Sequence, residues 1–69
     1  MQLSARNQIP ATVTGINEGE AIANIELEAC GSRLVSSITV EAAKQLGLEV
    51  GKEVIMVIKA SDVILATND

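Results

Sequence analysis

Apolar and polar residues alternate over the first half of the chain, with the period of two that is typical of β-strands. The alternation predicts strands over residues 9–16, 21–29 and 33–39, with turn residues at 17–20 and 30–32 between them. In the second of these strands, alanine, isoleucine and leucine occupy every other position. We therefore expect one side of this strand to face a core and the other to face water, as in an antiparallel sheet.

After residue 39 the period changes to that of a short helix. Thr39 is a suitable N-cap and Gly47 a suitable terminator for a helix between them. The pattern then predicts a fourth strand over residues 53–59 and a fifth over 63–66. Five strands with one short helix between the third and fourth predict an all-β chain folded as a small OB-type barrel. An SH3-like barrel is the closest alternative from the pattern alone.

The length of 69 residues fits one domain, which we expect to span residues 1–69. A chain this short is marginally stable alone, and such chains commonly rely on disulfides, a metal or oligomerisation. One cysteine excludes an internal disulfide, and the absence of histidine argues against a zinc site. Because 48% of the residues are hydrophobic and the mean hydropathy is +0.34, the surplus of apolar surface points to self-association.

Charge and aromatic content exclude several classes of partner. Nine acidic residues oppose five basic ones, so the net charge is −4 and a polyanion is repelled. The chain has no Phe, Tyr or Trp, which single-stranded nucleic-acid binders use to stack bases. We therefore expect binding neither to nucleic acid nor to an anionic membrane. No apolar run reaches the roughly 18 residues of a membrane span. The N-terminus lacks the pattern of a signal peptide, so a cytoplasmic location is expected.

Two short polar segments near the ends of the chain carry the candidate chemistry. One is Ser4, Ala5, Arg6 and Asn7 before the first strand, and the other is Lys59, Ala60 and Ser61 after the fourth. Each combines a cation with a hydroxyl group and with small residues that let backbone N–H groups approach a ligand. Together they could enclose a small oxyanion, which needs many donors once it leaves water. The simpler reading is that Arg6 pairs with a surface carboxylate and that Lys59 is solvated at a sheet edge.

The same segments belong to an ordered set of motifs. In chain order these are SARNQ at residues 4–8, IT at 38–39, AAKQLGL at 42–48, GKEV at 51–54 and KASDVI at 59–64. The set covers nearly the whole chain and resembles the molbindins, small proteins with Mop-like or TOBE domains that bind molybdate. The resemblance implies an OB-type barrel and favours it over the SH3-like alternative.

The resemblance adds a third segment to the candidate site, at the start of the short helix. In the molbindins the hydroxyl at the position of Thr39 contributes to the molybdate site, and some relatives carry a serine where this chain has Ala42. That hydroxyl is missing here, so the contact expected from Ala42 is its backbone N–H, one of the free N–H groups of a first helical turn. The alternative from the residues alone is that Thr39 only caps the helix.

The resemblance also implies how the site is assembled. Molbindins form hexamers, built as trimers of dimers, with sites between subunits. On this basis we expect Ser4 and Arg6 of one chain to face Lys59 and Thr39 of another, around molybdate or the similar tungstate. The protein is expected to bind the oxygens of this anion, with no direct bond from a side chain to a metal and no further cofactor.

An enzyme is not expected, because the chain has no histidine, nucleophile–base pair, metal-ligand cluster or phosphate-binding glycine loop. The prediction is a protein that binds molybdate reversibly for storage or homeostasis. One alternative is a ligand-sensing or accessory TOBE module of a molybdate regulator or transporter. A chain that starts with Met and ends soon after the last predicted strand favours a free-standing protein instead. The other alternative is a structural assembly protein without a ligand.

Overall fold

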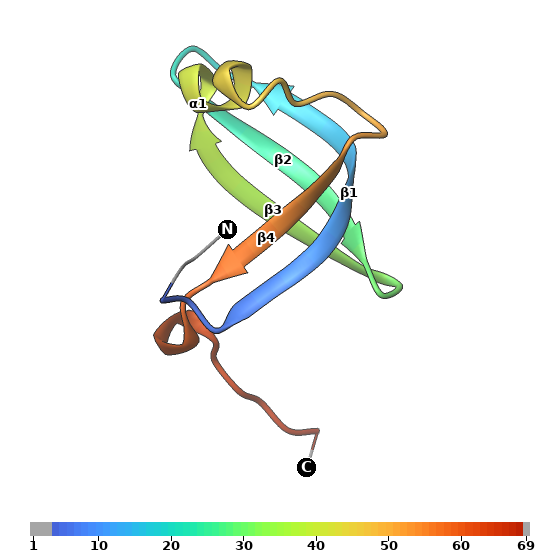
Figure 1. Cartoon of the computed structure of the whole chain (residues 1–69), viewed down its shortest axis with the longest axis vertical. Helices are drawn as coiled ribbons and strands as arrows, with labels where there is room; N and C mark the ends of the chain where they lie inside the picture. Colours follow the sequence, from blue (N-terminus) through green and yellow to red (C-terminus); the bar gives the residue numbers. More distant parts are fainter. Residues whose placement is uncertain (1–3, 69) are drawn as a thin grey trace.

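The computed structural model describes residues 4–68, which form four strands, one α-helix and one 3-10 helix (Figure 1). Along the chain these are β1 (Asn7–Glu18), β2 (Ile22–Ala29), β3 (Ser32–Thr39), α1 (Val40–Gln45), β4 (Glu53–Ile58) and η1 (Ala60–Asp62). The predicted helix between the third and fourth strands is confirmed. Within this described part of the chain, neither helix is long and apolar enough to cross a membrane.

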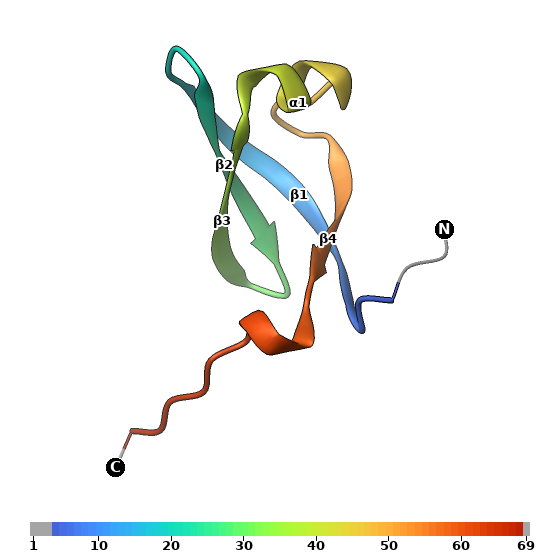
Figure 2. The same ribbon diagram turned by 90° about the vertical axis from the view of Figure 1, so that its left-hand side faces the viewer.

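The strands form one antiparallel sheet in the order β3-β2-β1-β4. The long strand β1 pairs along its first half with β4, beginning with Asn7 opposite Ile58, and along its second half with β2. A register shift between Val13 and Gly15 marks a bulge, which increases the local bend and twist of β1. The sheet therefore curls into an open barrel in which the outer strands β3 and β4 face one another (Figure 2).

The predicted OB-type barrel is confirmed, with four strands rather than five. The fifth strand predicted over residues 63–66 is wrong, because this stretch forms no strand among the residues that the structure describes. A strand needs an edge to pair with, and η1 turns the chain away from the barrel at the end of β4 (Figures 1 and 2). We call residues 63–68 the C-terminal arm.

The core lies inside the curled sheet and is lined by one side of each strand. Val13 and Ile25 are the largest fully buried side chains, with 1% and 2% of their surface exposed. In β2 the predicted alternation is confirmed from Ala23 to Ala29, whereas Ala21 is exposed in the turn before the strand. The inward residues of β3 and β4 are only half-buried. The core is therefore least complete where these two outer strands face each other.

Helix α1 closes one end of the barrel through its buried residue Ala43. Thr39 is the N-cap, as predicted, and its Oγ1 accepts a hydrogen bond from the N–H of Ala42 at 3.0 Å. Beyond the other end of the helix, Gly47 has a φ of 65°, in the left-handed region that glycine adopts without strain. Lys52 Nζ donates to two carbonyl oxygens of this last turn, at 2.7 and 3.2 Å. A lysine from the following loop thus holds the helix end in place.

Candidate functional site

The two polar end segments lie side by side at one end of the barrel. β1 starts and β4 ends there, because the two strands are antiparallel neighbours with Asn7 opposite Ile58. The Asn7 side chain reinforces this pairing, since its Nδ2 donates to the carbonyl oxygen of Ile58 at 3.2 Å. We call this region, made of residues 4–7 and 59–61, the β1–β4 end. The barrel thus brings together the two segments that the sequence singled out.

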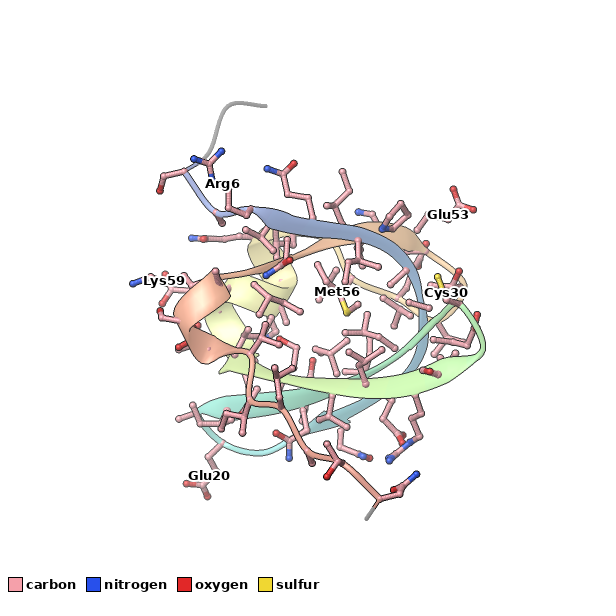
Figure 3. The ribbon with its side chains drawn as sticks, turned by 90° about the horizontal axis from the view of Figure 1, so that it is seen from below. Arg6, Glu20, Cys30, Glu53, Met56 and Lys59 are labelled. Carbon is pink, nitrogen blue, oxygen red and sulfur yellow. The ribbon has the colours of Figure 1, made fainter. Side chains whose placement is uncertain are left out.

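The β1–β4 end carries two cations on exposed side chains, Arg6 and Lys59, which project on the same side of the barrel (Figure 3). Within residues 4–7 and 59–62 they outnumber the single carboxylate, that of Asp62, although the whole chain has a net charge of −4. A guanidinium offers paired donors in one plane, and an ammonium offers a mobile point charge. This end of the molecule is therefore the electrostatically favourable place for a small anion.

Neutral donors lie next to these cations, in η1. The turn is closed by two bonds, from Asp62 N–H to the carbonyl oxygen of Lys59 at 2.9 Å and from Val63 N–H to that of Ala60 at 3.3 Å. The N–H groups of Ala60 and Ser61 precede these bonds and have no acceptor within the turn. With the exposed Ser61 hydroxyl, they add three neutral donors to the charge of Lys59.

Two side chains at the start of β1 hold the segment that precedes the strand. Gln8 Nε2 donates to the carbonyl oxygen of Ala5 at 3.3 Å, and Asn7 is bonded to β4 as described above. Ser4 and Arg6 are exposed, while Ala5 is half-buried. One amide hydrogen of Asn7 is therefore engaged in positioning the segment, and the freely directed donors are those of Ser4 and Arg6.

Thr39 and Ala42 lie at the opposite end of the barrel. Thr39 closes β3 opposite Ile22, the first residue of β2, and α1 follows directly. Figure 1 shows α1 at one end of the molecule and η1 at the other. The expected grouping of Lys59 with Thr39 on one subunit is therefore wrong. Within one chain Lys59 neighbours the segment of Arg6, because β4 runs antiparallel to β1 and ends where β1 begins.

The N–H groups at the start of α1 are partly occupied. Val40 N–H donates to the carbonyl oxygen of Ala21 at 2.8 Å, and Ala42 N–H donates to Thr39 Oγ1. The expectation of a free N–H at Ala42 is thus wrong, because the side chain of the N-cap takes it. The Thr39 hydroxyl keeps its own hydrogen, which it can donate to an oxyanion while it accepts from Ala42.

The surroundings of Thr39 do not favour an anion by themselves. An open depression of about 570 Å³ beside it is lined by Glu20, Glu41 and Lys44, among others. Two carboxylates against one ammonium repel a dianion. The Thr39 end thus offers a hydroxyl without net positive charge, whereas the β1–β4 end offers the charge.

Among residues 4–68, no group of three or more His, Cys, Asp and Glu side chains could hold a metal ion. The donors described above are N–H and O–H groups, and the cations are an arginine and a lysine. Such a set binds the oxygens of a preformed anion by hydrogen bonds and charge. The arrangement therefore supports recognition of an oxyanion.

Residues 3–65 match the TOBE domain family. A probable molybdenum-pterin-binding protein of Haemophilus influenzae is 39% identical over 69 residues, covering 99% of this chain and 100% of that protein. Molybdenum-pterin-binding protein 1 of Clostridium pasteurianum is 38% identical over 66 residues, covering 94% of this chain and 97% of that protein. Among solved structures, a molybdate-binding protein from Sporomusa ovata matches with a TM-score of 0.92 and 33% identity, over 97% of this chain and 100% of that one.

These similarities extend over nearly the whole of each relative, so they concern the complete barrel rather than one motif. All three relatives are described as binding proteins. The motifs that carried the resemblance, from residue 4 to residue 64, lie within the matched region of 3–65. The chain therefore belongs to the TOBE domain family, and its resemblance to the molbindins is confirmed.

Proposed function

We propose that this protein binds molybdate, or the similarly sized tungstate, reversibly and without catalysing a reaction. The observation that carries the proposal is the β1–β4 end, where strand pairing sets the segments of Arg6 and Lys59 side by side on an acidic chain. The similar protein from Sporomusa ovata, described as molybdate-binding, supports the choice of anion. The role that follows is storage or homeostasis of molybdate in the cytoplasm.

When the anion binds, donors of the protein replace the water molecules around it. A dianion that leaves water needs a donor for each lone pair it presents, and its burial without them costs several kcal/mol. Arg6 and Lys59 provide charge-assisted bonds, which are the strong ones. The hydroxyls of Ser4 and Ser61 and the N–H of Ala60 add neutral donors. Because the fold fixes the backbone of these segments beforehand, little ordering is required on binding. Selection against the smaller sulfate then follows from the size of the enclosed space.

The site is shared between subunits. One chain separates the charged β1–β4 end from the Thr39 hydroxyl, so an anion that touches both lies between two copies. In this arrangement residues 4–7 and 59–61 of one subunit face Thr39 of another. The cations Arg6 and Lys59 then offset the negative charge of the carboxylates beside Thr39. The proposed assembly is a hexamer built from three dimers. Exposed valine and isoleucine side chains on the outer strands, such as Val35 at 55% and Ile55 at 54%, support subunit contacts.

A molybdenum–pterin complex is a second candidate, because two relatives are named for that ligand. A pterin is a flat ring, and ring ligands are usually enclosed by apolar and aromatic side chains. This chain has no Phe, Tyr or Trp to stack on such a ring. The donors at the β1–β4 end recognise an oxyanion, so the bare anion is favoured.

In this proposal residues 1–69 act as one TOBE domain. A sensing or accessory module of a regulator or transporter would use the same site. It differs from a storage protein because its anion-bound form would contact the regulator or transporter. A structural assembly protein differs more sharply, since a ligand that binds the folded state must stabilise it and a protein without a ligand shows no such effect.

Native mass spectrometry of the full chain, titrated separately with molybdate, sulfate and a pterin, tests the proposal. We expect a hexamer that takes up a fixed number of molybdates and ignores sulfate at the same concentration. Arg6→Gln should weaken uptake strongly. Arg33→Gln is the matched control, because Arg33 is paired with Glu26 across the β2–β3 hairpin, away from both candidate segments.

Three results would contradict the proposal. The first is an oligomer whose mass does not change with molybdate, which would leave an assembly protein without a ligand. The second is equal uptake of sulfate, which would remove the selectivity. The third is an Arg6→Gln protein that behaves like Arg33→Gln, which would remove the β1–β4 end as the site. Uptake of the pterin alone would favour the second candidate.

A further inference from the structure

The motif SARNQ ends in Gln8, a residue to which the proposed anion site assigns no contact. Gln8 is the second residue of β1, where it lies opposite Val57 of β4 and exposes its side chain. Successive side chains of a strand point to opposite faces, so Gln8 projects to the face opposite that of Asn7. Its amide turns back along the chain, and Nε2 donates to the carbonyl oxygen of Ala5 at 3.3 Å. Gln8 therefore ties β1 to the segment that precedes the strand.

The segment before β1 has little else to hold it. Among residues 4–68, none of the backbone hydrogen bonds of turns and loops involves Ser4, Ala5 or Arg6. The pairing of β1 with β4 begins only at Asn7. Within this part of the chain, the bond from Gln8 is also the only side-chain hydrogen bond that reaches the segment. The bend at Arg6 is thus held on one side by the start of the strand and on the other by Gln8.

The guanidinium of Arg6 has no carboxylate partner within the described chain. The one salt bridge between residues 4 and 68 joins Arg33 to Glu26, and the Arg6 side chain is exposed (Figure 3). No ion pair therefore directs this side chain, and its direction depends on the backbone that carries it. A bidentate contact with an oxyanion needs the planar guanidinium in one orientation. The affinity of the site should thus depend on what holds the backbone of Arg6.

We propose that Gln8 is a positioning residue of the anion site, which raises the affinity for the oxyanion by holding the bend at Arg6. The inference rests on the proposed function, because it requires that Arg6 binds the anion. The bond from Gln8 to Ala5 orders this bend when the chain folds, so less conformational freedom is lost when the anion binds. Loss of one neutral hydrogen bond of this kind should weaken binding by about 3- to 10-fold.

The first test compares the molybdate affinity of full-length variants by isothermal titration calorimetry. Gln8→Met keeps the length of the side chain and removes the donor. Thr14→Met is the matched control, because Thr14 is an exposed residue of the same strand and its side chain makes no hydrogen bond within residues 4–68. We expect about 3- to 10-fold weaker binding for Gln8→Met and unchanged binding for Thr14→Met. The urea midpoint of Gln8→Met should stay at that of the native chain, because the lost bond is exposed.

The second test asks whether Gln8 acts through Arg6. In a double-mutant cycle, Gln8→Met is added to Arg6→Gln, and we expect no further loss of affinity because the group that Gln8 positions is already absent. A measurement without molybdate complements the cycle. The ¹⁵N heteronuclear NOE reports backbone motion on the picosecond to nanosecond timescale, and Gln8→Met should lower it at Ala5 and Arg6 while leaving Lys59 unchanged.

Each result has a definite meaning. A Gln8→Met protein that binds as tightly as the native chain overturns the inference, and so does one that loses the same factor again in the Arg6→Gln background. A lowered urea midpoint with an unchanged NOE at Arg6 means that Gln8 stabilises the fold instead of positioning Arg6. A native chain that takes up no molybdate overturns the proposed function, whereas a native chain that binds it as well as Gln8→Met does overturns this inference alone.

Discussion

Thr39 caps α1 and is proposed to contact the anion, and substitutions at this position can separate these two roles. Its Oγ1 caps α1 by accepting from Ala42 N–H at 3.0 Å, while its hydroxyl hydrogen is available to an oxyanion. Thr39→Val removes the acceptor and the donor with little change in shape. Thr39→Asp keeps an oxygen that caps a helix well, but it replaces the donor with a negative charge. Capping and anion binding should therefore respond differently to the two changes.

The expected magnitudes follow from the two kinds of bond. Loss of an N-cap costs about 0.5–2 kcal/mol of stability, and we expect about 1 kcal/mol for Thr39→Val because the capping bond has ordinary length and is exposed. Thr39→Asp should stay within about 0.5 kcal/mol of the unaltered chain. A lost hydrogen bond to a charged partner costs about 1.5–3 kcal/mol, so Thr39→Val should bind molybdate about 10- to 100-fold more weakly. Thr39→Asp should bind more weakly still, since its carboxylate repels the anion.

Stability is measured by urea unfolding followed by far-UV circular dichroism, at one protein concentration and without molybdate. Affinity is measured by isothermal titration calorimetry. A Thr39→Asp protein that binds molybdate as tightly as the unaltered chain would refute the reasoning and leave Thr39 as a cap alone. An unchanged urea midpoint for Thr39→Val would refute the capping role instead.

Three further predictions concern the core, the helix end and the charge around Thr39. Ile25→Ala should destabilise the fold by about 2–5 kcal/mol, because removing a side chain that is 2% exposed leaves a cavity. A smaller loss of stability, measured by thermal unfolding, would mean that the surrounding core collapses to fill the cavity. Lys52→Met should lower the free energy of unfolding by about 1 kcal/mol more than Lys44→Met does. Both lysines complement the helix dipole, but Lys52 also donates to two carbonyl oxygens. Equal urea midpoints for the two variants would contradict this prediction. Glu20→Gln removes a negative charge beside Thr39, so it should tighten molybdate binding by about 0.5–1 kcal/mol at low salt and by less at high salt. Weaker binding in calorimetry would count against a site beside Thr39.

Features that depend on near neighbours in the chain could be predicted from the sequence. The alternation from Ala23 to Ala29 gave the core side of β2, and Thr39 and Gly47 gave the ends of α1. The prediction of a fifth strand over residues 63–66 failed for a different reason. Its apolar pattern is that of a strand, but pairing depends on which edge lies within reach, and the direction of the chain after η1 decides that. No local pattern encodes this direction.

The candidate site shows the same division. Cations, hydroxyls and small residues marked both end segments, and antiparallel pairing of β1 with β4 brings them together. The position of Thr39 at the other end depends on strand order, which composition and spacing do not reveal. The bond between Thr39 and Ala42 was missed as a competitor for the ligand, although an N-cap threonine was itself the signal, since capping consumes an N–H of the first turn.

The short turn η1 belongs to two parts of the molecule at once. Its residues Ala60 and Ser61, with Lys59 before them, supply donors to the proposed anion site, and the same turn sets the direction of the C-terminal arm. An anion that binds these donors would hold the turn in one geometry, and the bonds of the same turn direct residues 63–68. Anion binding and the direction of the arm are therefore expected to be linked: an anion that binds one direction of the arm better makes that direction more populated, and fixing that direction raises the affinity for the anion by the same factor.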